Sequence, residues 1–154
     1  MLRFFQSLSS FFAKRERIDY NIPERNVRYK PFVFAIASYV FGFLALLSLK
    51  APALMICMMV AYAINTGVMS LITLFWKISI HAAGVTGPMT FLVYALGWQW
   101  GFLYLLMLPV GGIKLLMREH SISQLVAGAV ISAALSWLQI IFILPVFNAY
   151  YLTG

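Results

Sequence analysis

Five long apolar runs follow one another along this chain, with only short polar connections between them. They cover residues 31–49, 53–76, 79–98, 101–117 and 121–147. A helix needs about 20 apolar residues to cross the hydrocarbon core of a bilayer, and each run is close to that length. Backbone polar groups find no partners in lipid, so such runs must form helices. The sequence therefore predicts an all-α integral membrane protein, a bundle of about five transmembrane helices.

The overall composition excludes a soluble globular domain. Hydrophobic residues make up 63% of the chain and charged residues 10%, whereas soluble domains are typically about 45–50% apolar and about 25% charged. The connections between the runs are too short to hold a second core. Residues 31–154 are therefore expected to form one transmembrane domain.

The N-terminal segment differs from the rest of the chain. Apolar side chains recur at three- and four-residue spacing over residues 1–18, and Lys14, Arg15 and Arg17 follow them. This pattern is typical of an amphipathic helix at a membrane surface, and it lacks the continuous apolar core of a cleaved signal peptide. Residues 19–30 are polar and without period. For residues 1–30 we expect a retained N-terminal amphipathic helix and a polar connector.

Charge is concentrated in the same segment. Seven of the 11 Lys and Arg residues precede residue 31, and the formal net charge is +7. Basic residues beside a transmembrane run indicate contact with anionic lipid headgroups, so we expect no nucleic-acid partner. The positive-inside rule places the N terminus in the cytoplasm and, after five crossings, the C terminus outside.

Prolines and glycines predict where the helices are interrupted. The segment Lys50–Pro52 is expected to form a tight turn, with the proline at a helix start. Pro88 predicts a kink in the third run. Pro109, with two glycines after it, predicts irregular turns before Lys114 in the fourth run, and Pro145 predicts that the fifth run ends at about residue 147.

Two polar clusters interrupt the apolar sequence. The first spans residues 77–84, the second spans residues 114–124, and together they contain Lys77, Ser79, His81, Lys114, Arg118, Glu119, His120, Ser121, Ser123 and Gln124. Both histidines of the protein are among them. Polar groups at membrane depth are energetically unfavourable and usually line a site or pair with one another. The two clusters are therefore the expected functional site.

The spacing of the runs predicts that the two clusters lie at the same membrane face. Ser121 and Gln124 have the spacing of a capping box, which predicts a helix start just after His120. His81 is at the start of the third run, and the chain crosses the membrane and returns between the two histidines. With the N terminus inside, this face is the cytoplasmic one.

The residue types in these clusters suit the chemistry of an oxyanion. Lys77 and His81 are four residues apart, as are Lys114 and Arg118, so each pair shares a helix face. Converging cations and exposed helix N-termini bind phosphate. One histidine can attack phosphorus while the other protonates the leaving oxygen. Glu119 is the only nearby carboxylate, so this chemistry predicts no metal and no other cofactor.

The first cluster resembles a motif of the type 2 phosphatidic acid phosphatase superfamily of membrane lipid phosphatases. That motif is Pro-Ser-Gly-His at a helix start. Here Ser79 and His81 are in register with its serine and histidine, whereas Ile78 and Ile80 replace its proline and glycine.

The second cluster is similar to a later motif of the same superfamily. In that motif an arginine is followed after five residues by a histidine, after three more by an aspartate, and four positions further by a glycine. Lys114, His120, Gln124 and Gly128 stand at these positions. The resemblance covers about residues 60–130 and is to a small, divergent prokaryotic branch, which implies the plasma membrane of a prokaryote.

The resemblance implies roles for these residues. His120 matches the nucleophile that forms a phosphohistidine, and His81 matches the acid that protonates the leaving alcohol. Gln124 takes the place of the aspartate that orients the nucleophile, while Lys114 and Ser79 match phosphate-binding residues. The implied substrate is a lipid phosphate monoester or a diphosphate, such as phosphatidate or a prenyl diphosphate. Lys77 and Arg118 are expected to add positive charge to the phosphate site.

The chain also departs from the family pattern. An earlier motif, a lysine followed after six residues by Arg-Pro, has no counterpart, and Lys114 lacks the bidentate geometry of arginine. Gln124 can orient a histidine but cannot stabilise imidazolium as aspartate does. Family sites also usually face away from the cytoplasm.

Two alternatives to a lipid phosphatase stay open. One is a non-catalytic relative that binds a lipid phosphate. The other is a structural subunit of a membrane complex, in which His81 or His120 ligates haem or a pigment. Membrane lipids are partners in each case, and the sequence leaves the oligomeric state open.

Overall fold

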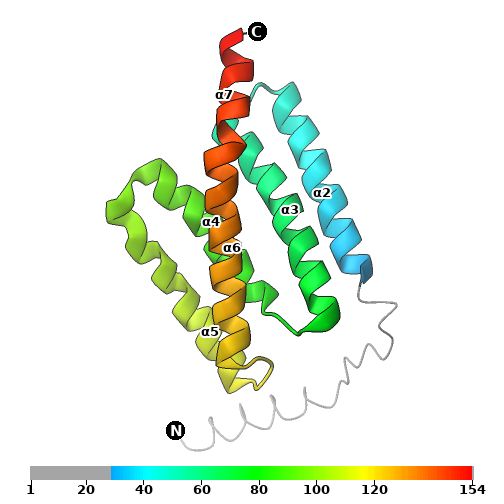
Figure 1. The fold of residues 1–154 in the computed structure, drawn as a ribbon, viewed down its shortest axis with the longest axis vertical. Helices are drawn as coiled ribbons and strands as arrows, with labels where there is room; N and C mark the ends of the chain where they lie inside the picture. Colours follow the sequence, from blue (N-terminus) through cyan, green and yellow to red (C-terminus); the bar gives the residue numbers. More distant parts are fainter. Residues whose placement is uncertain (1–28, 154) are drawn as a thin grey trace, which may run out of the picture. The chain divides into compact units, whose positions relative to one another are not determined.

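The computed structural model describes residues 29–153. The amphipathic helix and connector predicted for residues 1–30 therefore lie outside the described residues, apart from the first two residues of α2. All regular secondary structure in the described range is helical (Figure 1). The helices are α2 (Tyr29–Ser48), α3 (Ala53–Phe75), α4 (Ile80–Leu96), the 3₁₀ helix η2 (Trp98–Leu106), α5 (Met107–Leu116), α6 (Ile122–Phe142) and α7 (Leu144–Thr153).

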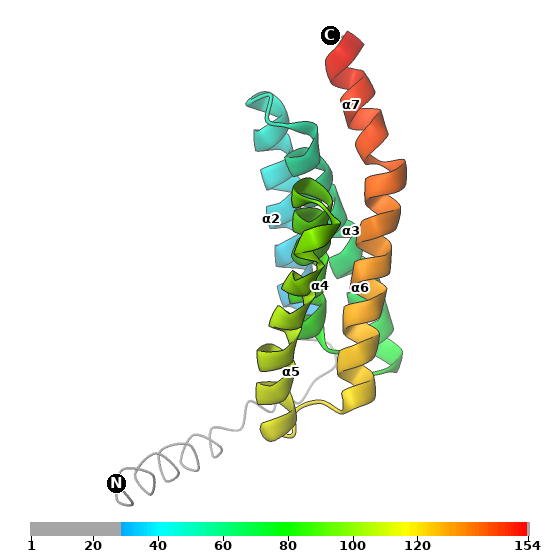
Figure 2. The same ribbon diagram turned by 90° about the vertical axis from the view of Figure 1, so that its left-hand side faces the viewer.

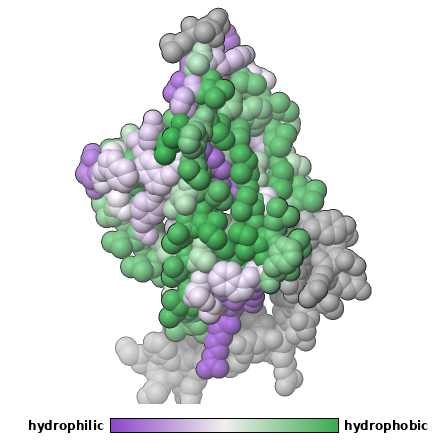
Figure 3. Space-filling model, in the orientation of Figure 1, coloured by the Kyte–Doolittle hydropathy of each residue, from purple (hydrophilic) through white to green (hydrophobic). Residues whose placement is uncertain are grey.

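Three helical stretches are long and apolar enough to cross a membrane. They are Ala53–Phe75, Trp98–Leu116 and Ile122–Tyr150, and the two shorter apolar helices cover Phe32–Ser48 and Ile80–Leu96. These five stretches match the five predicted runs in order and approximate bounds. Figure 3 shows a largely hydrophobic face along the helices, with hydrophilic residues gathered toward the ends.

The predicted turn between the first two runs is confirmed. The backbone N–H groups of Lys50 and Ala51 donate to the carbonyl oxygens of Leu47 and Leu46, at 3.1 Å and 3.0 Å. This pattern closes the end of α2 in a Schellman motif, with Lys50 in the left-handed conformation at φ 50°. Pro52 then stands at the N-cap of α3, where its missing N–H removes no helical hydrogen bond.

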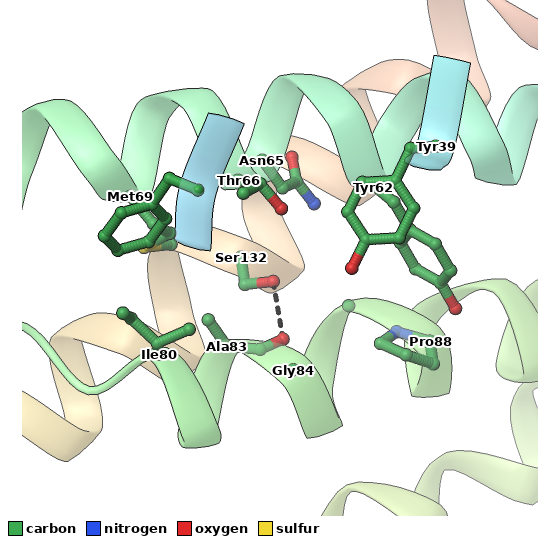
Figure 4. Close-up of a pocket in the computed structure, with 12 residues that line it drawn as sticks. Tyr39, Tyr62, Asn65, Thr66, Met69, Ile80, Ala83, Gly84, Pro88 and Ser132 are labelled. Carbon is green, nitrogen blue, oxygen red and sulfur yellow. Dashed lines mark hydrogen bonds between the residues drawn. The ribbon is translucent and has the colours of Figure 1, made fainter. Parts of the chain in front are cut away.

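The helices α4 and α6 form the centre of the bundle, and small residues let them approach closely. The hydroxyl of Thr86 donates to the carbonyl of Ala129 at 3.1 Å, and Ser132 donates to the carbonyl of Ala83 at 2.9 Å (Figure 4). A Cβ added at Gly87 would lie 2.9 Å from the Ser132 hydroxyl. Such interhelical hydrogen bonds between closely spaced backbones are typical of helix packing in membranes.

A buried polar layer connects α3 to α6. The amide of Asn65 donates to the Ser136 hydroxyl, and the amide of Gln139 donates to the Asn65 oxygen, both at 3.0 Å. Cys57, the only cysteine, is fully buried beside this layer among apolar side chains. The layer fixes the position of α3 along α6, because sliding either helix would leave buried amides unpaired.

The predicted position of irregular backbone in the fourth run is wrong. The irregular part is at the start, where residues 98–106 form a 3₁₀ helix, whereas α5 is regular through both glycines as far as Leu116. Gly97, at φ 101°, separates the end of α4 from the start of η2 at Trp98. Pro109 is the third residue of α5, just after the change from 3₁₀ helix to α-helix, and the helix continues past it to Leu116.

The predicted end of the fifth run at residue 147 is also wrong. The helix α6 ends at Phe142, α7 begins at Leu144, and helical structure continues to Thr153. Pro145 lies in the first turn of α7, where proline is tolerated because its N–H is not needed. Pro88 lies inside α4, which continues from Ile80 to Leu96, and the kink expected at Pro88 stays a prediction.

The start of α4 rests directly on α6. The backbone N–H of Ser79 donates to the carbonyl of Gln124 at 3.2 Å. One turn further along α6, a Cβ added at Gly128 would collide with the carbonyl oxygen of Ser79. Glycine at this position therefore permits the contact between the two helix starts.

We expect Gly128→Ala to lower the free energy of unfolding by about 1–3 kcal/mol, the usual effect of overpacking. Gly67→Ala is the matched control, because Gly67 lies inside α3 with no atom within 4 Å of an added Cβ. That change should be neutral or stabilising by up to about 1 kcal/mol. Unfolding in mixed detergent micelles, followed by circular dichroism, measures both. Equal stability of the two variants would contradict the close contact.

Candidate functional site

The two polar clusters meet at one end of the bundle. The start of α4, the end of α5 and the start of α6 lie together at this end in both views (Figures 1 and 2). The hydrogen bond from Ser79 to Gln124 connects the clusters directly. The prediction that His81 and His120 share one end is therefore confirmed, whereas the membrane face at which this end lies stays a prediction.

His120 is held by the capping box of α6. The predicted box is present, because the Ser121 hydroxyl accepts from the backbone N–H of Gln124 and the Gln124 side chain accepts from the backbone N–H of Ser121. The same amide oxygen lies 3.1 Å from Nδ1 of His120. An amide oxygen only accepts, so Nδ1 donates in this bond, and in the neutral imidazole Nε2 then carries the lone pair. A lone pair on Nε2 is what a nucleophile or a proton acceptor needs.

Lys114 is paired with Glu119 through a tight turn. The Lys114 Nζ lies 2.6 Å from Oε2 of Glu119, and the two side chains are 16% and 39% exposed. The backbone N–H of Glu119 donates to the carbonyl of Lys114, and that of Arg118 to Leu115, at 3.1 Å and 3.0 Å. These bonds form a Schellman motif at the end of α5. The hydrogen bond from Lys114 is the main cause that lowers the pKa of Glu119 below 4.5.

Sequence reasoning identified Glu119 only as the nearest carboxylate and did not predict its partner. Lysine and glutamate five residues apart do not face each other on a helix. They meet here because Arg118 adopts the left-handed conformation, at φ 53°, and reverses the chain. No sequence signal marks this turn, since a glycine is the residue that usually does so.

His81 lies in the first turn of α4 and is exposed. Its imidazole interacts electrostatically with Lys114, Glu119 and His120. The structure thus groups both histidines with Lys114, as the sequence predicts, and adds Glu119 to them.

Ser79 is used differently from the role that the resemblance implies. Its side chain is fully buried, and its hydroxyl accepts from the backbone N–H of Ala82 at 3.3 Å, as the N-cap of α4. A capping hydroxyl enclosed in this way positions the start of α4 and is not open to a phosphate.

Lys77 and Arg118 are both exposed at this end of the bundle. Lys77 lies in the connection between α3 and α4 and makes no ion pair or hydrogen bond with another residue of the described range. Arg118 lies on the turn beside Glu119. Both side chains are free to reach a ligand.

A separate cavity of about 280 Å³ lies between α2, α3, α4 and α6 (Figure 4). Tyr39, Tyr62, Asn65, Gly84 and Pro88 are among the residues that line it. Neither histidine is among them. The cavity is therefore distinct from the group around His120.

The grouped side chains are of the types that can bind an anion and transfer a proton. The two imidazoles, Lys114 and Glu119 interact electrostatically, while residues 29–153 contain no group of three His, Cys, Asp or Glu side chains placed to hold a metal ion. No protein-family model matches the chain, and no match was found among curated proteins or solved structures.

We expect Lys114→Gln to raise the pKa of Glu119, because the mutation removes the hydrogen bond and the charge that hold the carboxyl ionised. With a folded pKa below the unfolded value, the stabilising pairing is complete above about pH 4.5 and is lost as the pH falls through the folded pKa. Carboxyl ¹³C NMR of glutamate-labelled protein measures the midpoint. Lys77→Gln is the control and should leave it unchanged, and an unchanged midpoint in Lys114→Gln would contradict the ion pair.

Proposed function

We propose that this chain is a divergent relative of the type 2 phosphatidic acid phosphatase superfamily and hydrolyses a lipid phosphate monoester or diphosphate. The observation that supports this proposal most is the 3.1 Å contact between Nδ1 of His120 and the Gln124 amide oxygen. It orients an imidazole with a free Nε2 in a site that also contains Lys114 and His81. A nucleophile, an orienting group, a cation and a second imidazole are the parts that a phosphohistidine mechanism needs.

The proposed reaction has two steps. In the first, Nε2 of His120 forms a bond to phosphorus, the bond from phosphorus to the lipid oxygen breaks, and that oxygen takes a proton from His81. In the second, water attacks phosphorus, His81 takes a proton from the water, and the P–N bond breaks to restore the lone pair on Nε2. Lys114, Arg118 and Lys77 stabilise the phosphoryl oxygens throughout.

The proposed location is the plasma membrane of a prokaryote. The three long apolar stretches support membrane insertion, and the basic residues before residue 31 support a cytoplasmic N terminus and an outer C terminus. The site at the start of α4 and α6 then opens at the cytoplasmic surface. A phosphate attached to a lipid is presented at the depth of helix ends, where these side chains lie.

A second candidate is a protein that binds a lipid phosphate without cleaving it. Gln124 favours this alternative, because a neutral amide orients His120 but does not stabilise the positive charge that builds up on a phosphorylated imidazole.

The structural-subunit alternative also has a simple test, since haem or pigment bound to the purified protein gives a visible absorption band.

The test of catalysis is phosphate release from a panel of lipid phosphates in mixed micelles. We expect His120→Ala to lower the rate by about 10³-fold or more, because no other group forms the covalent intermediate. We expect His81→Ala to lower the rate by about 10²–10⁴-fold on lipid monoesters but less on an activated aryl phosphate, whose leaving group needs little protonation. Gln124→Asp should raise turnover.

Lys50→Ala is the control for this panel, because Lys50 lies in the turn at the other end of α2 and α3. It should leave phosphate release unchanged. Phosphate release that persists in His120→Ala would contradict the proposed role of His120 as the nucleophile. If wild-type protein binds lipid phosphate but releases no phosphate, the proposed phosphatase activity is wrong and the lipid-phosphate-binding function takes its place.

The conformation of Arg118 allows its side chain to be tested apart from the fold. Arg118 and Lys50 both occupy the left-handed position of a Schellman turn, which disfavours any side chain by about 1 kcal/mol relative to glycine. Arg118→Gly and Lys50→Gly should therefore each raise the free energy of unfolding by about that amount. Only Arg118→Gly should weaken the inhibition of the enzyme by inorganic phosphate. Equal inhibition of the two variants by inorganic phosphate would show that the Arg118 side chain does not bind phosphate.

A further inference from the structure

We propose that Glu119 is an internal competitor for the phosphate, because its carboxylate occupies the position at Lys114 that a phosphate oxygen takes when the ligand binds. This inference rests on the proposed function, since it concerns the same phosphate site. It assigns a regulatory role to a residue that the family motif does not contain.

The geometry of the turn supports this competition. The Lys114 Nζ and the Glu119 Oε2 are 2.6 Å apart, which is a short, charge-assisted hydrogen bond. The backbone bond from Glu119 to Lys114 closes the same turn, so both side chains start from one rigid segment. Glu119 is also the only acidic residue between positions 29 and 154. No other acidic residue of this range is present to replace it at Lys114.

The partners of Lys114 explain why the carboxylate is there in the absence of a ligand. Only 16% of the Lys114 side chain is exposed, and a largely buried ammonium group without a partner is unfavourable. A carboxylate oxygen and a phosphate oxygen are the same kind of acceptor for Nζ. Glu119 therefore satisfies Lys114 at rest, and a phosphate has to displace it.

The ligand can displace Glu119 because the ion pair is weak. The Glu119 side chain is 39% exposed, so water and salt screen its attraction to Lys114. A phosphate monoester carries up to two negative charges, so it is attracted more strongly than a single carboxylate to Lys114 and to other positive charges of the proposed site. Glu119 interacts electrostatically with both histidines as well. Its charge lowers the positive potential of the whole site and limits how tightly any anion is held.

This arrangement has a consequence for the product. Inorganic phosphate leaves more readily when a carboxylate on the same turn returns to Lys114. Removing the competitor should therefore strengthen product binding. It should lower both KM and the rate of turnover where phosphate release limits the rate.

The experiment measures binding of inorganic phosphate to the purified full-length chain in micelles by titration calorimetry. We expect Glu119→Gln to bind phosphate about two- to fivefold more tightly than wild type, because it removes a competing interaction of up to about 1 kcal/mol. Glu119→Asp, which shortens the reach by one methylene, should give a smaller increase. Unchanged or weaker binding by Glu119→Gln would overturn the proposal.

A double-mutant cycle with Lys114→Gln separates competition for Lys114 from simple repulsion. If Glu119 acts by occupying Lys114, Glu119→Gln should have little effect once Lys114 is gone. An equal gain in both backgrounds would overturn the competition and leave only a through-space charge effect.

The same measurements separate this inference from the proposed function. If Lys114→Gln weakens phosphate binding but Glu119→Gln does not strengthen it, the phosphate site stands and the competition fails. If neither wild type nor any variant binds phosphate, the proposed function fails and the inference fails with it. If Glu119→Gln binds phosphate and wild type does not, Glu119 competes strongly enough to exclude phosphate, which supports the proposal.

Discussion

The contact between the backbone of Ser79 and Gly128 is the constraint on which the site depends. The start of α4 can lie on α6 only because position 128 has no side chain, and the bond from Ser79 to Gln124 then fixes the depth of the contact. His81 is two residues beyond Ser79, and His120 is four residues before Gln124. A side chain at position 128 would separate the two helix starts and, with them, the two histidines. The glycine of the second cluster therefore has a packing role, one helical turn from the group that orients His120.

Gln124 joins the fold to the proposed chemistry. Its side-chain oxygen caps α6 through the backbone of Ser121 and contacts His120, while its backbone carbonyl accepts from Ser79. A helix start needs such acceptors and donors in any case, so the orientation of His120 follows from the capping of α6. Groups whose positions are over-determined in this way are preorganised, which a phosphoryl-transfer site requires. The cap of α6 thus orients the His120 imidazole, and the cap of α4 positions the helical turn that carries His81.

The sequence predicted the capping box from a pattern within one turn of chain, and it predicted the helices and the shared end of the two histidines from the lengths and order of the apolar runs. The approximate bounds of the five runs are confirmed. The effects of Pro109 and Pro145 on the helices were wrongly predicted. Proline interrupts a helix interior but is compatible with a first turn, and the neighbouring residues do not indicate which of the two positions applies. Lys114 and Glu119 were not paired because their contact requires a left-handed Arg118. The burial of Ser79 depends on α6, which lies more than forty residues away in the sequence.

The proposed site needs two kinds of resting partner, and the structure contains one of each. His120 and Lys114 both lie partly buried among apolar helices, so both need a hydrogen-bond partner in the absence of a ligand. Gln124 binds His120 at Nδ1, away from Nε2, and this partner stays in place while Nε2 reacts. Glu119 binds the same Nζ of Lys114 that a phosphate must reach. A neutral amide therefore serves the residue that must keep its orientation during the reaction. A carboxylate serves the residue that must exchange its partner when the phosphate binds and leaves.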